Sequence, residues 1–202
     1  MRHLFVMDPL DRLNYHHDST WMMMLECQRQ GDQVFWCEPA ALFATGGQSF
    51  ASAQKVIPLP EKPYFEVFSW EDQALNGMDV VWMRKDPPFD MTYIFATYHL
   101  SLSKALIIND PAGLRNRNEK LFAFSYPDLT PETLISQDIS RLLAFTKSLP
   151  EKVVLKPWDG NGGRGVLISQ KGDPNLKSML EILTGDGKQA IIAQRYIPEI
   201  TQ

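Results

Sequence analysis

Short apolar runs, separated by polar or proline-containing breaks, dominate the first half of the chain. Four of them predict buried strands, at residues 4–7, 34–37, 80–83 and 106–108. Asp18 and Ser19 can cap a helix that ends near Gly31, and a second helix is expected over about residues 92–105. Because strands and helices alternate, residues 1 to about 115 predict an open parallel sheet covered by helices, with ligand-facing loops at the strand ends.

One segment departs from this alternation. Gly46 and Gly47 separate Leu42 and Phe43 from a polar, alternating stretch that reaches Ile57. A glycine pair between two such runs is typical of a β-hairpin.

The second half of the chain has a different order of elements. A short helix is expected to begin at Asn118, and further helices are expected at about residues 140–147 and after Asp173 and Pro174. Strands are predicted at residues 153–155, 166–168 and 190–193. Since a glycine-rich turn joins the first two of these strands, we expect the turn at the tip of an antiparallel hairpin. The sequence therefore predicts two domains, residues 1–117 and 118–202, in an α/β protein.

Composition and charge limit the classes of function. Of the 202 residues, 44% are hydrophobic and 22% are charged, which is typical of a soluble globular protein. The net charge of −4 offers no basic field for nucleic acid or an anionic membrane. Cys27 and Cys37 have no zinc-site spacing, and two thiols predict reduced cysteines. No apolar run has the length of a signal peptide or a membrane span, so we expect a cytoplasmic protein.

The strongest sign of chemistry is a glycine-rich stretch after the strand at 153–155. It contains Lys156 and four glycines in the six positions 160–165. Its G-x-G-x-x-G spacing does not predict a dinucleotide turn, because a strand rather than a helix follows. A P-loop would need Gly-Lys-Ser/Thr, and the lysine of a kinase loop follows the glycines rather than preceding them. What remains is a glycine hairpin over nucleotide phosphates, or a mobile turn that binds nothing.

Three other segments carry candidate chemistry. Arg84 lies at a strand end in a charged, proline-containing segment, where its planar guanidinium could bind a substrate carboxylate. The alternative is an ion-paired surface turn. Lys120, at the start of a helix, could contact phosphate or could be a solvated surface lysine. The segment from Gln194 to Ile197 follows the last strand, and its main-chain groups could pair with an adenine edge or simply end the strand.

Taken together, five motifs resemble bacterial glutathione synthetase, a family of the ATP-grasp ligase superfamily. They occupy residues 7–9, 83–90, 118–122, 128–133 and 156–163. The resemblance covers nearly the whole chain. It implies an N-terminal open parallel-sheet domain that precedes the ATP-grasp fold, followed by an incomplete ATP-grasp α+β domain.

The resemblance also implies a reaction and a set of site residues. The family joins γ-glutamylcysteine to glycine with ATP and Mg²⁺, through an acyl phosphate, and releases ADP and phosphate. By resemblance, Lys120 and Lys156 contact the ATP phosphates, and Arg84 lies near the peptide substrate. The loop closing over the phosphates matches Gly160, Asn161, Gly162 and Gly163, and the adenine segment matches Gln194, Arg195, Tyr196 and Ile197.

The family's metal ligands lie in a stretch beyond the adenine segment, and no position of this sequence matches them. We therefore expect no metal ligand among these residues, and no ligation by the 202 residues alone. Another ATP-grasp ligase that joins an amine to a different carboxylate stays open, as does a non-catalytic nucleotide-binding or regulatory module. The sequence also leaves open whether the chain forms a homo-oligomer.

Overall fold

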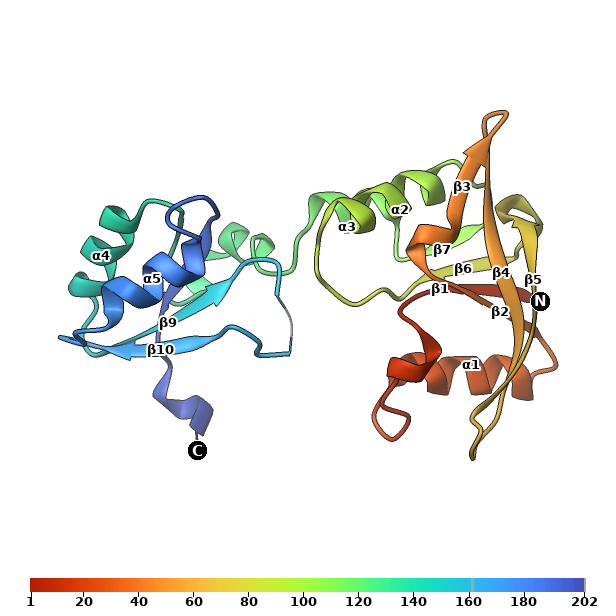
Figure 1. Ribbon diagram of the computed structural model, residues 1–202, viewed down its shortest axis with the longest axis horizontal. Helices are drawn as coiled ribbons and strands as arrows, with labels where there is room; N and C mark the ends of the chain where they lie inside the picture. Colours follow the sequence, from red (N-terminus) through yellow and green to blue (C-terminus); the bar gives the residue numbers. More distant parts are fainter. Residues whose placement is uncertain (161, 202) are drawn as a thin grey trace. The chain divides into compact units, whose positions relative to one another are not determined.

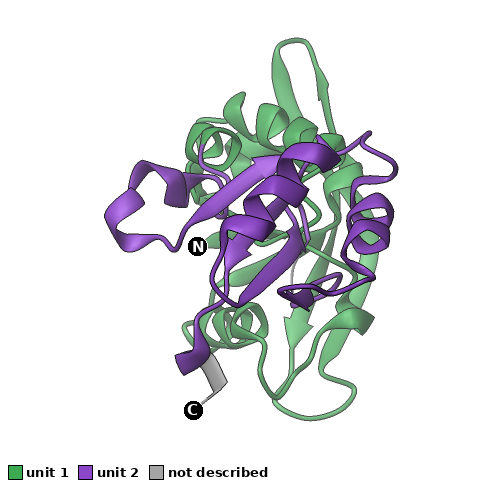
Figure 2. Ribbon diagram, turned by 90° about the vertical axis from the view of Figure 1, so that its left-hand side faces the viewer, with its two compact units in different colours: residues 1–116 green, residues 117–202 purple. Residues whose placement is uncertain are grey.

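A computed structural model describes residues 1–160 and 162–201. The chain forms two compact units, residues 1–116 and residues 117–202, which Figure 2 colours separately. In the part of the chain that the structure describes, no helix is long and apolar enough to cross a membrane.

A mixed sheet forms the centre of the first unit. Its strands are β1 (Arg2–Val6), β2 (Gln33–Cys37), β3 (Leu42–Thr45), β4 (Gln48–Pro58), β5 (Phe65–Ala74), β6 (Val80–Met83) and β7 (Leu106–Ile108). They follow the order β3-β4-β2-β1-β6-β7, with β5 also paired to β4. The strands β2, β1, β6 and β7 are parallel, which confirms the open parallel sheet. The hairpin at Gly46 and Gly47 is confirmed as well, but β5 was not foreseen.

Helices cover both faces of this sheet. They are α1 (Ser19–Arg29), α2 (Met91–Ser101) and α3 (Pro111–Asn116). Figure 1 shows α1 on one face and α2 and α3 on the other. The side chain of Asp18 accepts hydrogen bonds from the backbone N–H groups of Thr20 and Trp21 and so caps α1. Asp90 caps α2 in the same way through Tyr93.

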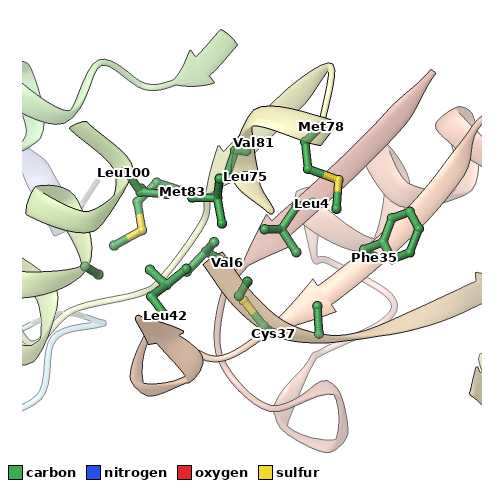
Figure 3. Close-up of a cluster of buried hydrophobic side chains, with 13 residues drawn as sticks. Leu4, Val6, Phe35, Cys37, Leu42, Leu75, Met78, Val81, Met83 and Leu100 are labelled. Atoms are coloured by element: carbon green, nitrogen blue, oxygen red, sulfur yellow. The ribbon is translucent and has the colours of Figure 1, made fainter. Parts of the chain in front are cut away.

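The alternation of side chains along the strands builds two cores. Leu4 and Val6 of β1 point towards α2 and pack in a cluster with Leu100, shown in Figure 3. Phe5 lies on the other face and packs in a cluster with Trp21 and Met24 of α1, among others. Because every second residue changes face, one apolar run contributes to the cores on both sides of the sheet.

The second unit contains a four-stranded antiparallel sheet. Its strands are β8 (Thr133–Ser136), β9 (Lys152–Pro157), β10 (Leu167–Gln170) and β11 (Ile191–Arg195), in the order β10-β9-β11-β8. Two helices, α4 (Ile139–Ser148) and α5 (Leu176–Thr184), pack on it. Val153 and Leu155 of β9 join their core. Lys156, the next residue, therefore lies on the opposite face of the sheet.

Among the described residues, six short 3₁₀ helices lie between these elements or after the last strand. They are η1 (Leu10–Arg12), η2 (Pro39–Ala41), η3 (Leu75–Gly77), η4 (Phe122–Ser125), η5 (Pro127–Leu129) and η6 (Pro198–Thr201). The helix expected from Asn118 is thus a turn followed by the 3₁₀ helix η4.

Candidate functional site

The glycine-rich stretch joins β9 to β10 at the tip of an antiparallel hairpin, as the sequence predicts (Figure 1). The two strands pair in continuous register from Leu167 opposite Leu155 to Gln170 opposite Lys152. Gly162 and Gly163 have φ angles of 57° and 74°, in the left-handed region where a side chain is disfavoured. Asn161, the remaining predicted loop residue, lies outside the described residues.

Both the backbone conformation and the lack of space favour glycine at position 165. Its φ is +73°, and a Cβ added there would lie 3.0 Å from the Cγ of Pro157. Gly160 differs, because its added Cβ would make only ordinary contacts, at 3.5 Å or more. The loop therefore returns closely over the end of β9.

Lys120 approaches this loop from a turn that precedes η4. The side chain of Asn118 stabilises the turn by accepting hydrogen bonds from the backbone N–H groups of Lys120 and Leu121, at 3.0 and 3.2 Å. The ammonium group of Lys120 then donates to the carbonyl oxygen of Gly160. Its Nζ also lies 3.4 Å from Oε1 of the exposed Glu119. Lys120 is thus held at the mouth of the loop rather than projecting into solvent.

Lys156 lies on the face of β9 that points away from the helices. Its Nζ donates to Oε1 of Gln194 on the neighbouring strand β11, at 2.9 Å. The amide Nε2 of Gln194 in turn donates to Oγ1 of Thr133 on β8, at 2.7 Å. A chain of neutral groups across three strands therefore orients the charged amine.

The surroundings of Lys156 disfavour the protonated, charged form of its amine. Burial, and then the positive charge of Lys120, hold the pKa of the Lys156 ammonium below its ordinary value. Two cations therefore lie under one glycine turn, and Lys156 donates its hydrogen bond to an uncharged amide oxygen. An anion between the two amines would offset both their repulsion and the cost of burial.

The structure brings Gln194 to this site in a way that sequence reasoning missed. The sequence predicts Gln194 as part of the adenine segment, and the structure adds that its side chain contacts Lys156 and Thr133. In the sequence, Thr133 is only the last residue of the motif at residues 128–133. Thr133 lies on the strand β8, which has only four residues. Its two apolar residues, Leu134 and Ile135, are too short a run to predict a strand from the sequence.

The other residues of the predicted adenine segment lie at the end of β11. Arg195 is the last residue of this strand, and Tyr196 and Ile197 follow it. The backbone N–H of Arg195 donates to the carbonyl of Glu132, and that of Tyr196 donates to the carbonyl of Lys152. Because these two N–H groups are already paired, contacts with adenine would use the remaining main-chain groups of the segment. The Lys152 amine lies 5.4 Å from the centre of the Tyr196 ring, and both line a cavity of about 210 Å³. Ile197 is 45% exposed.

Arg84 lies in the first unit, at the end of β6. Its Nε donates to Thr20 Oγ1 at 3.0 Å and its Nη2 donates to Ser19 Oγ at 2.9 Å. The guanidinium therefore fastens the first turn of α1 to the end of a central strand. Sequence reasoning missed these two hydroxyl partners, which are more than 60 residues away along the chain.

The charged segment after Arg84 is ion-paired. Lys85 Nζ lies 2.9 Å from Oδ1 of Asp8, and the backbone N–H of Asp86 donates to Oδ2 of the same carboxylate at 3.0 Å. Burial, followed by the charge of Asp8, raises the pKa of the Asp86 carboxyl. Asp8 thus ties the end of β1 to the segment after β6.

Among residues 1–160 and 162–201, no group of three or more His, Cys, Asp or Glu side chains could hold a metal ion.

Comparison with known proteins gives the same family from both units. The family model of the prokaryotic glutathione synthetase N-terminal domain matches residues 1–115. The model of the prokaryotic glutathione synthetase ATP-grasp domain matches residues 119–202.

Curated relatives carry the same name. Glutathione synthetase of Pseudomonas syringae pv. tomato is 42% identical over 200 residues, covering 96% of this chain and 62% of the relative. That of Parasynechococcus marenigrum is 39% identical over 205 residues, covering 100% of this chain and 66% of the relative. The chain thus spans somewhat less than two thirds of the length of these relatives.

Solved structures share the fold at low sequence identity. A RimK domain protein ATP-grasp from Sphaerobacter thermophilus has a TM-score of 0.62 at 16% identity, over 98% of this chain and 65% of that one. D-alanyl-alanine synthetase A from Vibrio cholerae has a TM-score of 0.58 at 12% identity, over 97% and 60%. These likenesses show the ATP-grasp ligase fold.

Proposed function

Because the chain belongs to the prokaryotic glutathione synthetase family, we propose that it serves the ATP-dependent ligation of γ-glutamylcysteine and glycine. The cysteine-end carboxylate is activated as an acyl phosphate, the glycine amine displaces the phosphate, and ADP and phosphate are released. A carboxylate is a poor electrophile, so this activation is what requires ATP.

The observation that carries the proposal is the pair of lysines under the glycine hairpin. Lys156 is half-buried beside the cation Lys120, and its pKa is lowered as a result. Such a pair costs folding free energy unless an anion lies between the amines. The phosphates of a nucleotide are anions of suitable size and charge.

Each residue of the site has a proposed part in binding. Lys120 and Lys156 neutralise phosphate charge, which is the largest contribution that a protein makes to phosphoryl transfer. Backbone groups of Gly160, Gly162 and Gly163 cover the phosphates, and Gln194 orients Lys156 through the bond at 2.9 Å. Arg195, Tyr196 and Ile197 are proposed to border the adenine. Arg84 is proposed to bind a carboxylate of the peptide substrate.

Mg²⁺ is proposed to accompany ATP, with no protein ligand assigned among the described residues. The proposed partners are small molecules, γ-glutamylcysteine and glycine, and the proposed location is the cytoplasm. No nucleic acid or membrane partner is part of the proposal.

The test is a ligation assay with the complete gene product, Mg-ATP, γ-glutamylcysteine and glycine. Mass spectrometry is expected to find ADP and glutathione in equal amounts, and Lys156→Met is expected to lower kcat/KM by about a hundredfold. Product formation with another carboxylate, and none with γ-glutamylcysteine, would contradict the substrate assignment.

A further inference from the structure

Thr133 is connected to Lys156 through the side chain of Gln194. Thr133 on β8 pairs directly with Gln194 on β11, and β11 pairs in turn with β9, which carries Lys156. The neighbouring residues Leu134 and Ala193 pack into the core that α4 and α5 cover. Because side chains alternate along a strand, Thr133, Gln194 and Lys156 form a polar row on the opposite face of the sheet.

Lys156 fixes the direction of the hydrogen bonds at one end of this polar row. A lysine ammonium group can only donate, so the group that faces it must accept. Gln194 meets this requirement with Oε1, which lies 2.9 Å from Lys156 Nζ. The donor Nε2 of the same amide group then faces Thr133, at 2.7 Å from Oγ1. The hydroxyl group of Thr133 must therefore accept.

Pro131 fixes the direction at the other end. Its carbonyl oxygen can only accept, and it lies 2.6 Å from Thr133 Oγ1. Because a hydroxyl group has a single proton, the bond to Pro131 uses that proton and leaves the lone pairs of Oγ1 to Gln194. All the hydrogen bonds consequently run one way, from Lys156 through Gln194 and Thr133 to Pro131.

A reversed amide group of Gln194 would break this order at both of its ends. Its Nε2 would face Lys156, so that two donors would meet beside a positive charge. Its Oε1 would face Thr133, whose proton would have to leave the carbonyl of Pro131. Because these groups are partly buried, leaving them without partners is unfavourable. The polar row therefore permits one orientation of the amide.

We propose that Thr133 is a positioning residue for phosphate binding, because its hydroxyl group holds the Gln194 amide with the acceptor towards Lys156. This inference rests on the proposed function, since it concerns how Lys156 is presented to the phosphates of ATP. The bond to Gln194 uses one proton of the ammonium group and leaves the others for the ligand. Without the Thr133 hydroxyl group the amide can rotate, and the amine loses its fixed direction.

A purely structural role for Thr133 makes a different prediction. If its hydroxyl group only joins β8 to β11, removing it should lower stability and leave Lys156 as it is. The strand β8 does not adjoin β9, because β11 lies between them. An effect of Thr133 on Lys156 therefore has to pass through the side chain of Gln194.

The first test measures affinity for an ATP analogue by fluorescence titration. Thr133→Val keeps the branched shape of the side chain but removes the hydroxyl group, and we expect affinity to fall by about fivefold. Thr133→Ser keeps the hydroxyl group and should stay within about twofold of the wild type. The matched control is Thr146→Val, which removes a hydroxyl group that donates to the carbonyl of Leu143 within α4, at 3.0 Å. Unchanged affinity in Thr133→Val, or an equal loss in Thr146→Val, would overturn the proposal.

The second test follows the pKa of Lys156 by ¹⁵N-lysine NMR without nucleotide. An oriented acceptor favours the charged amine, so Thr133→Val should lower this pKa and Thr133→Ser should not. When Thr133→Val is added to Gln194→Met, it should cause no further change, because Thr133 acts only through the amide. An unchanged pKa in Thr133→Val, or a further shift in the double variant, would overturn the proposal.

The two tests separate this inference from the proposed function. If the wild type binds no ATP, the proposed function fails, and the pKa of Lys156 still decides the role of Thr133. If the wild type binds ATP and Thr133→Val binds it equally well, the role of Thr133 is wrong and the proposed function stands.

Discussion

Lys156 donates a hydrogen bond to Gln194 across the strands β9 and β11, with 2.9 Å between Nζ and Oε1. The acceptor is neutral, and its own amide group is tied to Thr133. The strand pairing that permits this contact sets Lys156 opposite Ile192, two residues before Gln194. The amine is thus oriented without being neutralised, which leaves its charge available to an anionic ligand.

Replacing the amide of Gln194 by a carboxylate tests whether Lys156 needs a neutral acceptor in order to bind an anion. Gln194→Glu keeps the shape of the side chain but places a negative charge beside Lys156, so the pKa of Lys156 should rise. The carboxylate also competes with phosphate, and we expect ATP affinity to fall by about tenfold. Fluorescence titration with an ATP analogue measures the affinity. Tighter binding by Gln194→Glu would contradict the assigned orientation of the amine.

The pKa of Lys156 gives a second prediction. In the free protein it should lie below the ordinary value of 10.5, because of burial and then the charge of Lys120. Lys120→Met is expected to raise it only in part, since burial remains. Bound ATP should raise it further. A ¹⁵N-lysine NMR titration measures all three states, and a Lys156 pKa at or above 10.5 in the free protein would contradict this account.

The same shift predicts how stability depends on pH. The lowered pKa means that the folded state releases this proton at a lower pH than the unfolded state does. The contribution of Lys156 to the free energy of unfolding is therefore fully present above the pKa of the unfolded state, near 10.5. It is lost as the pH falls through the lower pKa of the folded state. Relative to Lys156→Met, the wild type should gain stability as the pH rises through this window, measured by urea unfolding. A flat difference between the two proteins would count against the shift.

Much of the fold could be predicted from the sequence, because buried strands such as those containing Leu4 and Val81 form short apolar runs. β5 was missed, although Val67 and Trp70 lie in an apolar segment, because its exposed side chains include as many charged groups as apolar ones. The glycine hairpin was foreseen from local pattern alone. The contacts of Lys156 and Arg84 were not, because strand register and the packing of α1 bring together residues far apart in the chain.

The glycine turn can be tested through stability. Gly165→Ala combines a left-handed φ with an approach of 3.0 Å to Pro157, and we expect it to cost more than about 2 kcal/mol. Gly172→Ala has a φ of +83° with nothing within 4 Å, so it isolates the backbone strain at about 1–2 kcal/mol. Gly160→Ala should cost less than about 0.5 kcal/mol. Urea unfolding measures each, and an equal cost for Gly165 and Gly160 would contradict the described turn.

Arg84 carries both a structural and a proposed binding role. Arg84→Met removes two hydrogen bonds to hydroxyl groups and is expected to lower stability by about 1–3 kcal/mol. The double variant Ser19→Ala with Thr20→Val removes the same bonds but keeps the guanidinium. If Arg84 also binds the peptide substrate, only Arg84→Met should weaken γ-glutamylcysteine binding in calorimetry. An equal loss of γ-glutamylcysteine binding in both variants would mean that Arg84 only holds α1 in position.

Calorimetric titration of the 202-residue protein with ATP tests the central claim most directly, since it measures the phosphate-binding role of Lys120 and Lys156 alone. We predict binding by the wild type and a loss of affinity of about tenfold or more in both Lys120→Met and Lys156→Met. Lys177→Met is the matched control, because this lysine of α5 has a side chain 69% exposed and pairs with Glu181. Binding that is lost equally in Lys177→Met, or unchanged in Lys156→Met, would contradict the account.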